Sequence, residues 1–149
     1  MARDQLLQEF ANASEHLIAT VTEAAQCGVT SNGETWGLRE VMAHLAGWEV
    51  MASVRIPHIL AGMAPLEEVS PERQEVMNDA VNATIITMAG DQSLDTICGI
   101  FRQVYQRNLA LLRTVDEKHF QPGEYLYERT KSVIEHYQEH LQELGLSAS

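Results

Sequence analysis

Two histidines near the carboxyl end of the chain have the spacing of a chelating pair. His136 and His140 lie four residues apart in a segment with a helical pattern, so their side chains should project from one face with Cβ atoms about 5–6 Å apart. Two imidazoles held in this way can share one divalent metal ion, while the second nitrogen of each ring stays free for an acceptor that fixes its tautomer. Because the six histidines of this chain would form such a pair by chance about one time in five, the spacing alone is a weak signal.

The apolar pattern of the same segment strengthens this signal. Val133, Tyr137 and Leu141 recur at helical spacing and form an apolar stripe. His136 and His140 lie along the edge of this stripe rather than opposite it, and a histidine in that position needs a partner. The pattern therefore favours two imidazoles at the border of the buried face, each with a partner.

A third candidate ligand, His44, lies in an earlier segment. Val41, Trp48 and Met51 form a helical stripe around it and would carry its ring toward the interior. For His44 by itself, a core histidine hydrogen-bonded to a carbonyl or to a neighbouring helix explains the pattern as well as a metal ligand does. Taken together, the three histidines predict a site for one divalent metal ion. We expect surface positions for the remaining three histidines, which are His16, His58 and His119.

Five helical segments are expected to position these residues. Clusters of glycine and proline separate them, and they cover about residues 3–26, 38–61, 71–90, 94–115 and 127–145. Ser70 followed by Pro71 is a helix start signal, and Gly145 is a natural helix end. No segment has the alternating pattern of a strand. The sequence predicts one all-α domain over residues 1–149, an up-down four-helix bundle with room for an extra short helix.

The composition argues against several classes of function. Ten Lys and Arg residues stand against 21 Asp and Glu residues, giving a formal charge of −11, which repels phosphate backbones and anionic membrane surfaces. We therefore expect no nucleic-acid partner. No stretch reaches the roughly 18 apolar residues of a membrane helix, and the amino terminus lacks the core of a signal peptide, so we expect a cytoplasmic protein. Cys27 and Cys98 are too few for a disulfide framework and are expected to be buried.

Two segments of the chain resemble signatures of the DinB/YfiT-like metalloenzyme superfamily. They are TWGLREVMAHLAGWE at 35–49 and EHYQEH at 135–140, and the likeness extends over the whole chain in length and helix order. It implies a four-helix bundle in which His44, His136 and His140 hold nickel, zinc or iron with coordination positions left open. Members include thiol-dependent transferases and isomerases and colibactin-resistance proteins, and these segments are more similar to the uncharacterised and resistance-type branches. Dimers are common in the superfamily, so a homodimer is an expectation too.

Three neutral imidazoles leave the ion its charge and its vacant positions, so the site could activate water, a thiol or a small electrophile. The expected function is a metal-dependent transferase or hydrolase acting on a small molecule. A non-catalytic metal- or ligand-binding protein and a helical interaction module are the alternatives. Glu40, one turn before His44, and Tyr137 are candidate general acids or bases, although a solvated helix-start glutamate and a packing tyrosine explain them equally. Trp36 and Trp48 could line a pocket or belong to the core.

Overall fold

The protein is described by a computed structural model that covers residues 2–29, 36–62 and 70–146. The helices are α1 (Ala2–Gln26), α2 (Leu38–Leu60), α3 (Pro71–Ala89), α4 (Leu94–Arg113), the short 3₁₀ helix η1 (Glu117–Phe120) and α5 (Tyr125–Glu143). The described ranges contain no strand, and the prediction of an all-α bundle is confirmed. Within those ranges, no helix has the length and apolar character needed to cross a bilayer.

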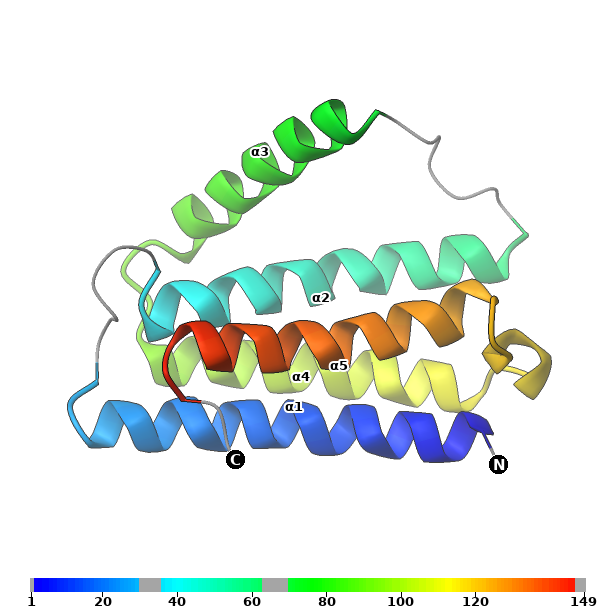
Figure 1. The fold of residues 1–149 in the computed structure, drawn as a ribbon, viewed down its shortest axis with the longest axis horizontal. Coiled ribbons are helices and arrows are strands. Elements are labelled where there is room, and N and C mark those ends of the chain that lie inside the picture. Colours follow the sequence, from blue (N-terminus) through cyan, green and yellow to red (C-terminus); the bar gives the residue numbers. More distant parts are fainter. Residues whose placement is uncertain (1, 30–35, 63–69, 147–149) are drawn as a thin grey trace.

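Four of the helices, α1, α2, α4 and α5, pack side by side (Figure 1). The extra helix is α3, which is 19 residues long rather than short. It runs back along α2 and tilts away from the rest of the bundle, so that α2 and α4 point in the same direction (Figure 1). Helix α3 packs chiefly on α2, and α1 packs on both α4 and α5. This arrangement places α3 against the part of α2 that carries His44, since Asn82 of α3 lies 2.8 Å from the His44 ring.

Aromatic and aliphatic side chains fill the space between the four packed helices. Phe10, Phe101 and Phe120 have no exposed surface, and burying a side chain of this size contributes about 1.5–3 kcal/mol. Phe101 packs edge-on against Tyr137 with 5.7 Å between the ring centroids, which joins α4 to α5. The α5 stripe that the sequence predicts is therefore part of this core.

The helix boundaries follow the local chemistry of the sequence. The Ser70 hydroxyl accepts a hydrogen bond from the backbone N–H of Arg73 at 3.3 Å, with proline at the first helical position, as the start signal predicts. Gly145 follows α5 with a φ of 71°, a conformation that favours glycine. Helix α5 begins at Tyr125, slightly before the predicted start. The prediction that both cysteines are buried is wrong for Cys27, which is exposed in the turn after α1.

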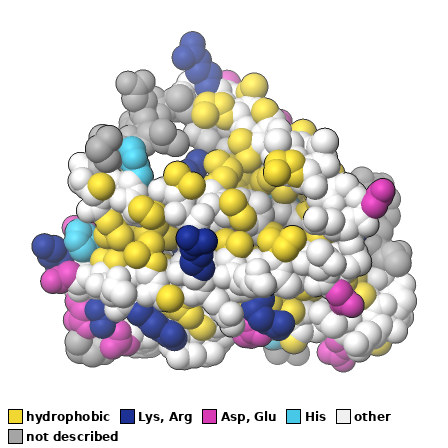
Figure 2. Space-filling model, turned by 180° about the vertical axis from the view of Figure 1, so that it is seen from behind, with side chains coloured by type: hydrophobic (Ala, Val, Ile, Leu, Met, Phe, Trp, Pro, Cys, Tyr) yellow, Lys and Arg dark blue, Asp and Glu magenta, His cyan; other side chains and the backbone are white. Residues whose placement is uncertain are grey.

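The tilt of α3 leaves an apolar groove on the rear face of the molecule. This rear groove has a volume of about 550 Å³ and lies between α3 and α4, with α2 as its floor. Its lining contains no charged side chain, and Val50, Met88 and Ile100 remain exposed at its edge. Figure 2 shows hydrophobic side chains gathered on this face. Residues 63–69, which belong to the connection between α2 and α3, lie outside the described part of the chain.

Candidate metal centre

Helices α2 and α5 bring the three predicted histidines together. The Nε2 atom of His136 lies 3.3 Å from that of His44 and 3.1 Å from that of His140. These residues form the only group of three or more potential metal-ligating side chains found among residues 2–29, 36–62 and 70–146. We call this group the histidine cluster. The spacing of four in α5 therefore does bring its two imidazoles to one point, and His44 joins them from a different helix.

Two of the three separations between the nitrogens match those of a common metal site. Zinc–imidazole bonds of about 2.0–2.1 Å in tetrahedral geometry place the donor atoms about 3.3 Å apart. The two Nε2 separations of 3.3 and 3.1 Å lie close to this value. Because the three ligand atoms lie within 4.8 Å of one another, rotation of the rings would bring all of them to one divalent ion.

The tautomer of His44 follows from a hydrogen-bonded asparagine in α3. Oδ1 of Asn82 lies 2.7 Å from Nε1 of Trp48 and 2.8 Å from Nδ1 of His44. Because the indole nitrogen can only donate, the asparagine atom between them must be the carbonyl oxygen. The same oxygen must then accept a proton from Nδ1 of His44. In the neutral ring, Nε2 carries the lone pair, and it faces the other two histidines.

Burial keeps two of the rings neutral. Desolvation lowers the pKa of His44 from 6.5 to about 4, against the opposing effect of the hydrogen bond to Asn82. Desolvation also lowers the pKa of His140 to about 4, and the neighbouring His136 acts in the same direction. Metal ligation requires unprotonated nitrogen. Both rings are therefore ready to bind a cation at neutral pH without first losing a proton.

Carboxylates lie beside the outer nitrogens of the two α5 rings. Oε2 of Glu139 is 3.7 Å from Nδ1 of His136, and Oε2 of Glu143 is 3.2 Å from Nδ1 of His140. Nδ1 of His140 is buried and has no well-oriented hydrogen bond among the described residues. A carboxylate beside the outer nitrogen of a ligating histidine fixes the ring and raises its basicity. A small rotation of the Glu143 side chain would complete this arrangement at His140.

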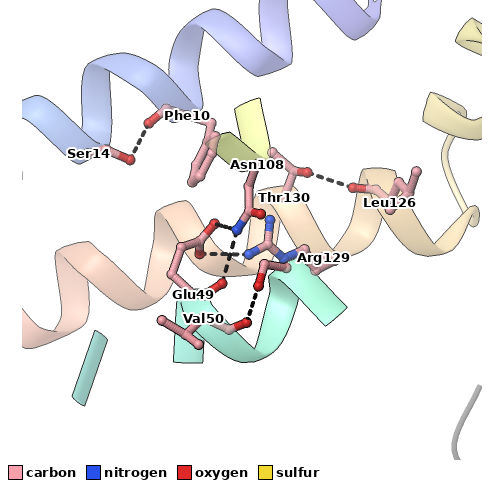
Figure 3. A network of polar contacts seen from close by, with 9 residues as sticks. Phe10, Ser14, Glu49, Val50, Asn108, Leu126, Arg129 and Thr130 are labelled. Atoms are coloured by element: carbon pink, nitrogen blue, oxygen red, sulfur yellow. Dashed lines mark hydrogen bonds and ion pairs between the residues drawn. The ribbon is translucent and has the colours of Figure 1, made fainter. Parts of the chain in front are cut away.

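A buried polar network fixes the position of α5 relative to α2 (Figure 3). Nη2 of Arg129 lies 2.7 Å from Oε2 of Glu49, and Nδ2 of Asn108 donates to Oε1 of the same glutamate at 2.9 Å. Only 2% of Glu49 is exposed. Arg129 precedes His136 on α5, and Glu49 follows His44 on α2. The network therefore holds in register the two helices that carry the histidine cluster.

The structure gives the two candidate acid–base residues other contacts. Oε1 of Glu40 pairs with Nη2 of Arg39 at 3.2 Å, and in the described part of the chain no hydrogen bond or ion pair joins it to the histidine cluster. Only 3% of Tyr137 is exposed, and its hydroxyl is buried, as expected for a packing tyrosine. Burial also raises the pKa of Tyr137 well above its usual value. A catalytic role for either residue remains a prediction.

The two tryptophans lie beside the cluster. The Trp36 ring is centred 4.9 Å from that of His44, and the Trp48 ring 6.4 Å from it. Both are partly exposed, so they flank the site rather than fill the core. Sequence reasoning missed Asn82 and Glu49, because a single amide or carboxylate in a helix gives no pattern that reveals its partner on another helix.

Comparison with known proteins identifies no relative of this chain. No protein family matches the sequence, and neither a curated protein nor a solved structure is significantly similar to it.

Proposed function

We propose that this protein is a metal-dependent enzyme that uses the histidine cluster to act on a small molecule. The observation that carries the proposal is the convergence of three Nε2 atoms. Nε2 of His136 lies 3.1 Å from that of His140 and 3.3 Å from that of His44. The lone pair of His44 is directed into this space by Asn82. The resemblance to the DinB/YfiT-like superfamily agrees with such a site and supports a transferase or hydrolase reaction.

The number and exposure of the ligands favour catalysis over a structural role. Structural zinc sites are closed by four protein ligands, whereas catalytic sites keep three and leave a position open. The described cluster has three members, and 46% of the His136 side chain is exposed, so a substrate can approach from solvent. An ion bound here, whether zinc, nickel or iron, would supply a Lewis acid that activates water or a thiol or polarises an electrophile.

The residues around the cluster would supply the rest of the site. Asn82 holds His44 in the ligating tautomer, and Trp36 and Trp48 exclude water from one side of its ring. The pKa values near 4 of His44 and His140 mean that a proton does not compete for their nitrogens near neutral pH. The protein would therefore orient the ligands and shield them, while the substrate enters on the His136 side.

The rear groove supports a second candidate function, the binding of an apolar ligand without catalysis. Its volume of about 550 Å³ falls in the range of about 300–1,000 Å³ typical of small-molecule sites. Binding of an apolar fluorescent dye that is lost in Ala80→Trp, which enlarges an exposed side chain lining the groove, would favour this function.

Turnover of simple substrates tests the enzymatic proposal. Protein loaded with zinc, nickel or iron is assayed with an activated ester, and with an activated aryl halide in the presence of a thiol. We expect turnover that requires metal, disappears in His140→Ala and persists in His16→Ala, which removes an exposed histidine of α1. Stoichiometric metal without turnover of either substrate would contradict the enzymatic proposal and favour a binding protein.

A further inference from the structure

A cleft opens beside the histidine cluster between α2 and α5. It has a volume of about 150 Å³, and His136 and Trp48 are among the residues that line it. Arg55, Tyr125 and Val133 contribute to its other walls. The cleft therefore connects the exposed member of the cluster with a basic side chain, and we call it the Arg55 cleft.

The walls of the Arg55 cleft suit a flat group. Trp48 cannot turn freely, because its indole N–H is hydrogen-bonded to Asn82 at 2.7 Å. Tyr125 and Val133 add further apolar surface. The lining also includes the ion pair of Glu49 and Arg129, and a volume of about 150 Å³ is large enough to accept benzene. The cleft thus has the size for a single ring or a planar chain of similar length.

Arg55 gives the cleft a positive charge that the described residues do not neutralise. Its guanidinium carbon lies 5.7 Å from the centre of the Trp48 ring, and no carboxylate of the described ranges forms an ion pair with it. Arg129, the other arginine of the cleft, is already paired with Glu49 at 2.7 Å. In a chain with a net charge of −11, Arg55 has no acidic partner within the described ranges, and its charge is therefore available to an anionic ligand in the cleft.

A guanidinium recognises a carboxylate by two parallel hydrogen bonds. The cleft thus combines a cation, an aromatic wall and, at the His136 end, the candidate metal centre. We propose that the Arg55 cleft binds a planar substrate through its carboxylate, with the flat portion against Trp48 and the reactive atom toward the histidine cluster. This inference deepens the proposed function. The orientation of the reactive atom toward the histidine cluster rests on that function, whereas the binding of the carboxylate by Arg55 does not.

Benzoate and benzamide are suitable probes, because they have nearly the same shape and differ in charge. Binding to zinc-loaded protein is followed by calorimetry and by the NMR signal of the Trp48 indole N–H, assigned with Trp48→Phe. We expect the dissociation constant of benzoate to be at least tenfold lower than that of benzamide. Arg55→Gln should abolish this preference and Arg55→Lys should reduce it. Arg107→Gln removes one exposed charge of α4 outside the cleft and should leave the preference unchanged.

Metal-free protein and the His44→Ala variant separate this inference from the proposed function. A preference for benzoate that needs Arg55 but not metal supports the carboxylate site even if the chain proves not to be a metalloenzyme. A preference that survives in Arg55→Gln and vanishes with the metal would show that the carboxylate binds the ion directly, which overturns the inference. Equal binding of benzoate and benzamide to the parent protein would overturn it as well.

Discussion

The hydrogen bonds of Asn82 offer a test of how the candidate metal site is organised. Replacing Asn82 with leucine keeps a side chain of similar size on α3 but removes the oxygen that accepts from His44 at 2.8 Å and from Trp48 at 2.7 Å. The His44 ring then loses the contact that fixes its tautomer. Both donors also lose their partner, at a cost of about 1–3 kcal/mol for each one that stays buried.

The expected effect on metal affinity follows from the role of such contacts in metal sites. Loss of a partner that orients a ligating histidine weakens metal binding by about 10–100-fold, which corresponds to about 1.4–2.8 kcal/mol. We therefore expect the zinc dissociation constant of Asn82→Leu to rise by this factor, measured by competition with a chromophoric chelator near neutral pH. Asn82→Asp keeps an acceptor oxygen at the same position and should retain most of the affinity.

Asn78→Leu is the matched control. Asn78 lies on α3 one turn before Asn82, and its side chain accepts a hydrogen bond from Gln74 instead of touching the histidine cluster. The control should bind zinc as the parent protein does. An unchanged dissociation constant in Asn82→Leu, or an equal loss in Asn78→Leu, would refute the inference that Asn82 fixes the ligating form of His44.

Three further changes probe the packing and the charges around the site. Glu49→Ala leaves a buried arginine without its partner, so urea unfolding should show a loss of about 3–5 kcal/mol, whereas a loss below about 1 kcal/mol would contradict the role given to the network. Gly47→Val should weaken zinc binding, because even a Cβ at this position would lie 2.5 Å from Cδ1 of Ile85 and would push α3 away from α2. An unchanged zinc affinity would argue against α3 as a support of the site. The metal-free protein should become less stable as the pH falls from about 6.5 toward 4, because the folded-state pKa values of His44 and His140 are lowered to about 4 and the unfolded chain therefore binds more protons in this range. By about pH 5 the free energy of unfolding should have fallen by at most about 2 kcal/mol per histidine, and residual solvent screening makes the fall smaller. A free energy of unfolding that does not change with pH in urea titrations would contradict the burial of the two rings.

Local patterns in the sequence predicted the helices and the grouping of the three histidines well. The spacing of His136 and His140 within one helix depends only on helix geometry, and the structure confirms that their rings meet. The start of α3 at Pro71 depends on the chemistry of neighbouring residues and was likewise predictable. The inward placement of His44 followed from the apolar stripe around it. The stripe left open whether the ring would serve as a metal ligand or only form a hydrogen bond.

Features that depend on how the helices pack could not be predicted from local patterns. Glu49 and Arg129 are 80 residues apart in the chain, and neither has a neighbour that reveals the other. The sequence shows α3 as a helical segment but not its tilt, which sets the rear groove and brings Asn82 over His44. Cys27 was expected to be buried as a small hydrophobic residue, but α1 ends just before it and leaves it in an exposed turn.

The central claim is that His44, His136 and His140 together hold one divalent ion. Elemental analysis and zinc titration of protein made without a histidine tag and without chelators test it most directly. The account predicts one ion per chain in the parent protein and in His16→Ala, and loss of tight binding in the alanine variant of each cluster member, with circular dichroism confirming that the variants stay folded. Folded parent protein that contains no metal and does not bind added zinc, nickel or iron would contradict it.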